Sequence, residues 1–227
     1  MSNNVQPSAA KSHPGQHRFT LLIIALLVIG VGAPILEMAL GGPGALLTEV
    51  AVAVSLLAAL WSVGTTRRGF QIAMALLAVN VVATVVWLLA DGVWAAPIAH
   101  TAGFFFLTIL AVAAVRAILE PGPVTLDKMI GGLCVYLLIG IGWGELYQLL
   151  FSFDQNAFSG IGEQTGHFLS WRLNYFSFVT LTTLGYGDVL PVTALAQSIT
   201  IIETLVGQLY LAVLVASLVS GYFEGKG

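Results

Sequence analysis

Residues 171–188 read WRLNYFSFVTLTTLGYGD, and this stretch decides the fold. Two long apolar runs flank it, residues 129–151 and 194–222. The part from Trp171 to Thr182, with Ser170 as a candidate N-cap, predicts a helix of about 18 Å, because each helical residue advances about 1.5 Å. Such a helix reaches only partway through a hydrocarbon core of roughly 30 Å. Irregular backbone at that depth is tolerated only where it is buried in protein or lines a water-filled cavity, so the residues that follow are expected to line a passage.

The composition places the chain in a membrane. Of its 227 residues, 58% are hydrophobic and only 8% are charged, which is too apolar for the surface of a water-soluble domain. The single cysteine, Cys134, excludes an intrachain disulfide and a cysteine metal cluster. A net charge of -3 with eight scattered basic residues offers no basic patch, so we expect no nucleic-acid partner.

Six apolar stretches are long enough to cross a bilayer, which takes about 20 helical residues. They cover residues 19–38, 45–63, 70–90, 97–118, 129–151 and 194–222. The sequence therefore predicts an all-α membrane protein with six transmembrane helices and a re-entrant pore helix between spans five and six. We divide it into an N-terminal tail (1–18), a four-helix membrane domain (19–128) and a pore domain (129–227).

The basic residues predict the orientation, because they disfavour translocation across the membrane. On one side of a six-span model lie Lys11, Arg18, Arg67, Arg68, Arg116, Lys128 and Lys226. The opposite loops carry Glu37, Glu49, Asp91, Asp154 and Glu163, with Arg172 as their one base. We expect a plasma-membrane protein with both termini in the cytoplasm. A cleaved signal peptide over residues 1–40 is a competing interpretation, although its apolar run exceeds the usual length of about 7 to 15 residues.

The string Thr183-Leu184-Gly185-Tyr186-Gly187-Asp188 resembles the signature of the potassium channel family, which is Thr-x-Gly-Tyr-Gly followed by Asp. The resemblance runs from the fifth span to the C-terminus, whereas the first four spans resemble the family only in number and topology. It implies a homotetramer in membrane lipid that conducts K⁺ passively, without enzymatic activity and without a cofactor besides the permeant ion. The implied K⁺ ligands are the carbonyls of Thr183, Leu184, Gly185 and Tyr186 and the Thr183 hydroxyl, with Gly187 completing the outer mouth.

Residues around this string are candidates for holding it in place. We expect Tyr175 to bond Asp188, where family members often have a hydrogen-bonding aromatic residue. Phe176 takes a second such position and has no group to bond the Tyr186 hydroxyl. Val179 replaces the carboxylate of some members, so the corresponding carboxyl pair is absent.

Two acids, Glu145 and Glu203, fall inside predicted spans, where a charged carboxylate is costly. One interpretation is structural: the acids are protonated or hydrogen-bonded to Ser177, Thr180 or Thr182. The other interpretation is a proton sensor beside the predicted ion filter, residues 183–187. Thr182 also ends the half-helix, whose carbonyl end favours a cation near the membrane centre.

Glycines in the last two spans allow two interpretations. Gly140 and Gly144 have the spacing that lets a neighbouring helix approach closely, so packing is expected there. Gly207 stands where many family members have a hinge glycine and is a candidate gating hinge, with packing as the alternative. One face of the last span is a candidate cavity lining: Leu211, Val215 and Val219.

The fourth predicted span has a single basic residue, Arg116, at its cytoplasmic end. Voltage-gated members carry arginines at every third position, because moving charge through the field drives opening. We therefore expect little voltage dependence. Three other functions stay open: a non-selective cation channel, a subunit of a potassium transporter and a non-conducting membrane scaffold.

Overall fold

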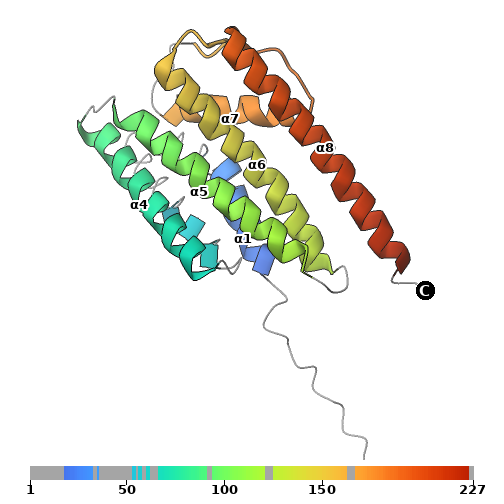
Figure 1. The fold of residues 1–227 in the computed structure, drawn as a ribbon. Coiled ribbons are helices and arrows are strands. Elements are labelled where there is room, and N and C mark those ends of the chain that lie inside the picture. Colours follow the sequence, from blue (N-terminus) through green and yellow to red (C-terminus); the bar gives the residue numbers. More distant parts are fainter. Residues whose placement is uncertain are drawn as a thin grey trace, which may run out of the picture.

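The computed structural model describes residues 18–32, 35, 53–54, 56–57, 60–61, 66–90, 94–120, 125–162 and 167–224. Within these ranges the chain is almost entirely helical (Figure 1). The helices are α1 (Arg18–Leu27), the π-helical turn η1 (Val28–Gly32), α4 (Arg67–Ala90), α5 (Ala95–Ile118), α6 (Leu126–Phe153), α7 (His167–Leu181) and α8 (Ala194–Glu224). Two short strands complete it, β1 (Phe158–Ser159) and β2 (Leu190–Pro191).

Four described helices, α4, α5, α6 and α8, are long and apolar enough to cross a membrane. They correspond to the third to sixth predicted spans, with ends that differ from the predicted ones by a few residues. The first predicted span contains α1 and η1 in its described part. The second, residues 45–63, lies outside the described residues except for six scattered positions, and the tail before Arg18 and the last three residues also lie outside them.

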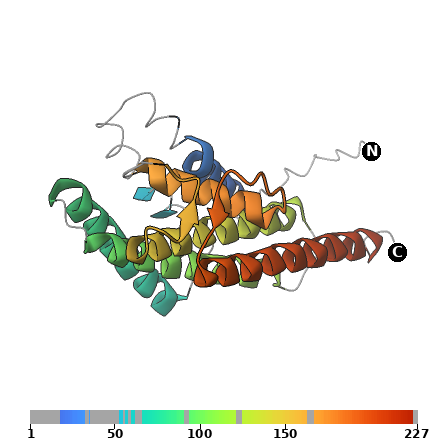
Figure 2. The same cartoon turned by 90° about the horizontal axis from the view of Figure 1, so that it is seen from above.

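Helices α4, α5 and α6 lie side by side, and α1 packs against α6 (Figures 1 and 2). The buried face of α5 consists largely of small residues, including Ala95, Ala99, Ala102 and Gly103. Small side chains let helices approach closely, which is how helices associate in lipid. Larger buried side chains such as Phe106, Leu110 and Leu138 fill the core between α5, α6 and α1. Helices α1 and α5 therefore pack directly against α6 of the same chain, and α4 packs against α5.

Helix α7 lies across the upper part of α6 (Figure 1). A Cβ atom at Gly140 would come within 2.5 Å of the Phe178 ring, and one at Gly144 within 2.0 Å of Asn174 Oδ1. Both glycines therefore make room for α7, which confirms the prediction that they serve helix packing.

Helix α7 is longer than predicted. Its 15 residues, about 22 Å at 1.5 Å each, begin at His167 rather than at Trp171. The prediction of Ser170 as N-cap is wrong, because Ser170 lies within the helix and its carbonyl accepts a bond from the Asn174 side chain. The helix is still shorter than each of α4, α5, α6 and α8 by about two and a half turns or more.

The two short strands pair in antiparallel fashion, Phe158 opposite Pro191 and Ser159 opposite Leu190. The Val192 amide also donates to the Ala157 carbonyl at 2.8 Å. This ribbon ties the segment after Asp188 to the loop after α6.

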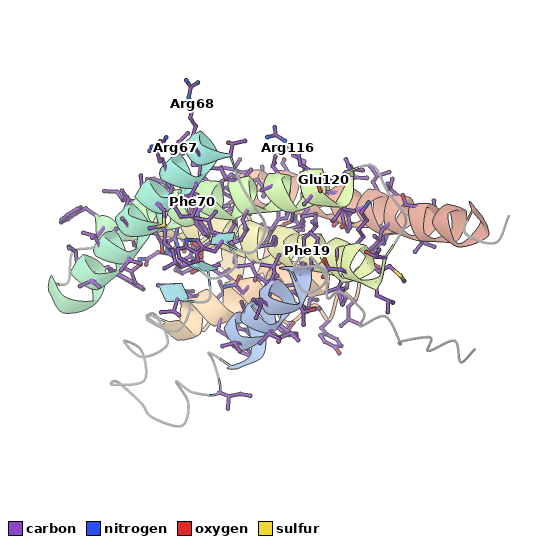
Figure 3. All side chains as sticks on the ribbon, turned by 90° about the horizontal axis from the view of Figure 1, so that it is seen from below. Phe19, Arg67, Arg68, Phe70, Arg116 and Glu120 are labelled. Atoms are coloured by element: carbon purple, nitrogen blue, oxygen red, sulfur yellow. The ribbon has the colours of Figure 1, made fainter. Side chains whose placement is uncertain are left out.

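Basic side chains gather at one end of the helical array. Figure 3 shows Arg67 and Arg68 projecting from the start of α4, with Arg116 and Glu120 near the end of α5. The α7 end of α6 lies at the opposite end of the array (Figure 1).

Candidate functional site

The filter string, Thr183 to Asp188, begins where α7 ends and folds back onto that helix. The Thr183 amide donates to the Thr180 carbonyl at 2.9 Å, and the Leu184 and Gly185 amides donate to the Val179 carbonyl at 2.9 and 3.2 Å. The last turn of α7 thus supplies acceptors for the first amides of the string. The first three backbone amides of the string are therefore turned toward the helix.

The backbone of the string alternates in handedness. Thr183, Gly185 and Gly187 have φ values of 58°, 57° and 76°, while Leu184 and Tyr186 between them are not among the residues with positive φ. Such alternation turns successive amides toward one side of the chain and successive carbonyls toward the other. Gly185 and Gly187 adopt positive φ at little cost, but Thr183 is β-branched, for which this conformation is strained. The surrounding contacts must therefore hold Thr183 in place.

Among the described residues, no hydrogen bond ends on the carbonyl oxygens of Thr183 to Gly187. Every residue from Thr182 to Asp188 is exposed within the single chain, including Leu184 at 54% and Tyr186 at 65%. A row of free carbonyls on one side of an extended backbone is a ligand set for a hard cation such as an alkali metal ion.

The outer end of the string is held by an arginine that the sequence reasoning missed. Arg172 of α7 forms an ion pair with Asp188 at 3.1 Å and donates to the Gly160 carbonyl at 3.2 Å. Gly160 has φ 79°, and a Cβ atom there would lie 1.9 Å from the Asp188 carbonyl oxygen. Arg172 and Gly160 together bring the β1 loop against the end of the string. The ion pair could not be predicted from the sequence separation of Arg172 and Asp188, because the two residues meet only where the chain folds back onto α7.

Aromatic side chains stack along the outer side of the string. Tyr175 lies between Trp171 and Tyr186, with ring centroids 5.9 Å and 6.5 Å away, and the Arg172 guanidinium lies 5.5 Å from the Tyr175 ring. Burial raises the pKa of Tyr175, and its hydrogen bond to Asp188 and the Asp188 charge raise it further. Phe176 faces away from this stack and contacts Tyr147 and Phe158.

Gln208 on α8 contacts the inner end of the string, which the sequence reasoning also missed. Its Nε2 lies 3.4 Å from Thr183 Oγ1, and its side chain is exposed. Leu211 and Val215 follow at helical spacing, so they share the α8 face that meets the string. The Gln208 contact therefore defines which face of α8 is turned toward the inner end of the string. Val219, the third predicted lining residue, has no described side chain.

Gly207 is a point of close contact between α8 and the end of α7. A Cβ atom at Gly207 would lie 2.6 Å from the Leu181 carbonyl oxygen. The Leu181 carbonyl also accepts a bond from the Tyr136 hydroxyl at 3.1 Å. Helix α8 continues through Gly207 without a break, so the packing interpretation has direct support and the hinge stays a prediction.

The two predicted intramembrane acids have different partners. Glu203 is fully buried and bonds Ser177, one of the partners considered from the sequence, and Tyr147. Glu145 instead lies 2.9 Å from His100 Nδ1 on α5, beside Gly103. The acids therefore occupy separate places, Glu203 between α6, α7 and α8 and Glu145 between α5 and α6.

Comparison with known proteins supports an ion channel. Residues 133–224, which include most of α6, all of α7 and α8 and the whole filter string, match the family model described as "Ion channel". This match and the four long apolar helices indicate an integral membrane protein with an ion channel domain. The family is not enzymatic, which confirms that prediction. A search of curated proteins and a search of solved structures gave no significant match.

Proposed function

We propose that this ion channel domain is selective for potassium and that four copies of the chain assemble around one pore. In this proposal the carbonyls of Thr183, Leu184, Gly185 and Tyr186, with the Thr183 hydroxyl, replace the water around a dehydrated K⁺ ion. Gly187 completes the outer mouth, and Thr182, Asp188 and Tyr175 support the string. No other cofactor takes part.

The observation that carries the proposal is the alternating backbone of residues 183–187 together with its unbonded carbonyls. An ordinary surface turn between two helices needs no such run of alternating residues, and Thr183 would not adopt positive φ without a constraint. The assignment of potassium as the permeant ion rests on the resemblance of the six-residue string to the potassium channel signature.

A single chain cannot surround an ion with one strand of carbonyls. Free carbonyls at membrane depth are costly in lipid, and they are tolerated where they line a water- or ion-filled passage. Helix α8 also leaves apolar side chains exposed along its length, and they supply a surface for further copies: Leu195, Ile201, Ile202, Leu205, Leu209, Val213 and Val215. Rotational symmetry with four copies closes such an assembly around one axis.

In the proposed topology, α7 and the string form a re-entrant segment between the fifth and sixth of six spans. The basic end of the array, with Arg67, Arg68 and Arg116, faces the cytoplasm together with both termini. The carbonyl end of α7 then points toward the membrane centre and favours a cation there. The protein acts in the plasma membrane, with lipids and its own copies as partners.

The same helices argue for weak voltage dependence. Within α5 the only lysine or arginine is Arg116 in the last turn, and the buried face of this helix is apolar. Movement of α5 would therefore carry almost no charge through the field, whereas steep voltage dependence needs several charges per subunit.

Purified protein in liposomes tests the proposal. We expect potassium to cross much faster than sodium, barium to block the flux, and the cross-linked protein to run as a tetramer. Equal potassium and sodium flux would favour a non-selective cation channel. A dimer or the absence of flux would contradict the proposal and favour a membrane scaffold.

A further inference from the structure

A buried acid joins the three helices α6, α7 and α8. Glu203 of α8 has no exposed surface, and the same is true of its neighbours Tyr147 of α6 and Ser177 of α7. Ser177 Oγ lies 2.5 Å from Glu203 Oε1 and 2.7 Å from the Gly140 carbonyl oxygen of α6. The Tyr147 hydroxyl bonds Glu203 Oε2. The acid is therefore in hydrogen-bond contact with both other helices of the pore domain.

The number of protons available decides the charge of this acid. Three contacts have to be filled, namely Tyr147 to Oε2, Ser177 to Oε1 and Ser177 to Gly140. Each hydroxyl donates one hydrogen. An ionised Glu203 leaves two hydrogens for three contacts, and two oxygen atoms would then meet without a proton. A protonated Glu203 donates to Ser177, Ser177 donates to Gly140, and Tyr147 donates to Glu203, so that all three contacts are filled.

The surroundings of Glu203 agree with a neutral acid. On α8 the Thr200 hydroxyl, 3.4 Å from the Tyr147 hydroxyl, donates to the Ala196 carbonyl and supplies no further hydrogen. The titratable groups that face Glu203 from α6 are Tyr147 and Tyr136, and the α7 contact is Ser177. No basic side chain of the described residues is paired with Glu203. An unpaired buried carboxylate would be costly at membrane depth.

We propose that Glu203 is a protonated positioning residue whose proton completes the contact between α6, α7 and α8. Ser177 lies two residues before Val179 and three before Thr180, whose carbonyls accept the first amide bonds of the filter string. Fixing Ser177 therefore fixes the turn of α7 from which the string starts. The role of this contact in conduction rests on the proposed channel function, while the protonated state does not.

Infrared spectroscopy of the assembled protein in lipid tests the protonated state without any flux. We expect a protonated-carboxyl band near neutral pH that is lost in Glu203→Gln and kept in Glu145→Gln, the matched change at the other intramembrane acid. Ser177→Ala should keep the band and shift it to higher frequency, because the acid loses its acceptor. A spectrum of Glu203→Gln that equals the wild-type spectrum in this region would overturn the proposal.

Flux measurements test the positioning role. Glutamine donates to Ser177 and accepts from Tyr147 without titrating, so Glu203→Gln should conduct with a flat alkaline pH profile, whereas the wild-type flux falls as the acid loses its proton. Glu203→Leu should lose flux by more than tenfold, because it removes both the bond to Ser177 and the bond from Tyr147, and each buried hydrogen bond contributes about 1 kcal/mol. Coinciding wild-type and glutamine profiles would overturn the positioning role. A wild-type protein without flux would instead refute the channel function, and the infrared result would still decide the charge of Glu203.

Discussion

At the scale of single residues, the filter string depends on backbone conformations that most side chains resist. Gly185 and Gly187 have positive φ, and apart from their immediate chain neighbours no atom of the described residues lies within 4 Å of the place that a Cβ atom would take at either glycine. A substitution there would therefore act through the backbone and not through a clash inside the subunit. The cost of holding an ordinary residue in this region is about 1–3 kcal/mol.

A graded series at Gly187 separates backbone strain from side-chain bulk. Asparagine adopts positive φ more readily than alanine, and β-branched valine resists it most. We expect the ratio of potassium to sodium flux to fall in the order Gly187, Gly187→Asn, Gly187→Ala, Gly187→Val. A valine variant with the wild-type ratio would show that the conformation at this position does not set selectivity.

Tyr175 gives a pH-dependent test of the outer support. Its pKa is raised by burial and by Asp188, so its bond stabilises the protein below the ordinary tyrosine pKa of about 10 and this stabilisation is lost as the pH rises through the higher folded value. We expect Tyr175→Phe to be less stable than wild type near neutral pH and equally stable in strong alkali. Thermal unfolding across pH measures this.

The Asp188 partner supplies the control for that experiment. In an Asp188→Asn background the carboxylate that raises the tyrosine pKa is gone, so Tyr175→Phe should have a smaller effect near neutral pH. An equal effect in both backgrounds would assign the stability of Tyr175 to its ring stacking with Trp171 and Tyr186.

At the scale of helices, close glycine contacts hold α7 between its neighbours. Gly140 and Gly144 admit α7 to α6, and Gly207 admits the end of α7 to α8. Helix α7 is thereby fixed between α6 and α8, and its position determines where the following string lies. Hydrogen bonds form at the same places. The Ser177 hydroxyl donates to the Gly140 carbonyl, and the Tyr136 hydroxyl donates to the Leu181 carbonyl beside Gly207.

Two helical glycines provide a matched test of this packing. A Cβ atom at Gly207 would clash with the Leu181 carbonyl, whereas at Gly142, apart from the backbone of its own helix turn and its chain neighbours, no described atom lies within 4 Å. Gly207→Ala should lower the free energy of unfolding by about 1–3 kcal/mol. Gly142→Ala should raise it by about 0.5–1 kcal/mol, as expected for alanine in a helix. Chemical unfolding in mild detergent compares them, and equal effects would contradict the assigned contact at Gly207.

The sequence predicted the long helices well, because continuous apolar runs bounded by charges and glycines carry that information. It also placed the end of α7 within one residue, at Thr182 where the structure has Leu181. The start of α7 and its N-cap were wrong, since the apolar pattern does not mark a helix start. The contacts of Arg172, Gly160 and Gln208 with the string were missed, because they depend on chain reversal and on the rotation of α8.

At the scale of the whole molecule, the helices before α6 pack against α6 or against each other within their own chain. His100 of α5 and Glu145 of α6 are joined at 2.9 Å, and Asn80 of α4 bonds the Ala99 carbonyl at 2.8 Å. These polar contacts link α4, α5 and α6 in one subunit. In an assembly of copies, helix α6 of each subunit would then be flanked by α5 of the same subunit, with α4 packed against α5.

Cross-linking tests this arrangement. Cysteines in place of His100 and Glu145, joined by a short bifunctional reagent, should give a product that runs as a single chain on a denaturing gel. The native Cys134 is buried and is replaced by alanine in every variant. Products of two or more chains, with little cross-linked single chain, would show that α5 packs on a neighbouring subunit.

The central claim is that carbonyl oxygens of residues 183–186 from four chains surround one line of ions. A density map of the assembled protein in potassium, compared with a map in sodium alone, tests this claim most directly. We predict a four-fold assembly with ion density on its axis, level with these carbonyls, in the potassium map. An assembly without a shared axis at the string, or carbonyls directed away from it, would contradict the claim.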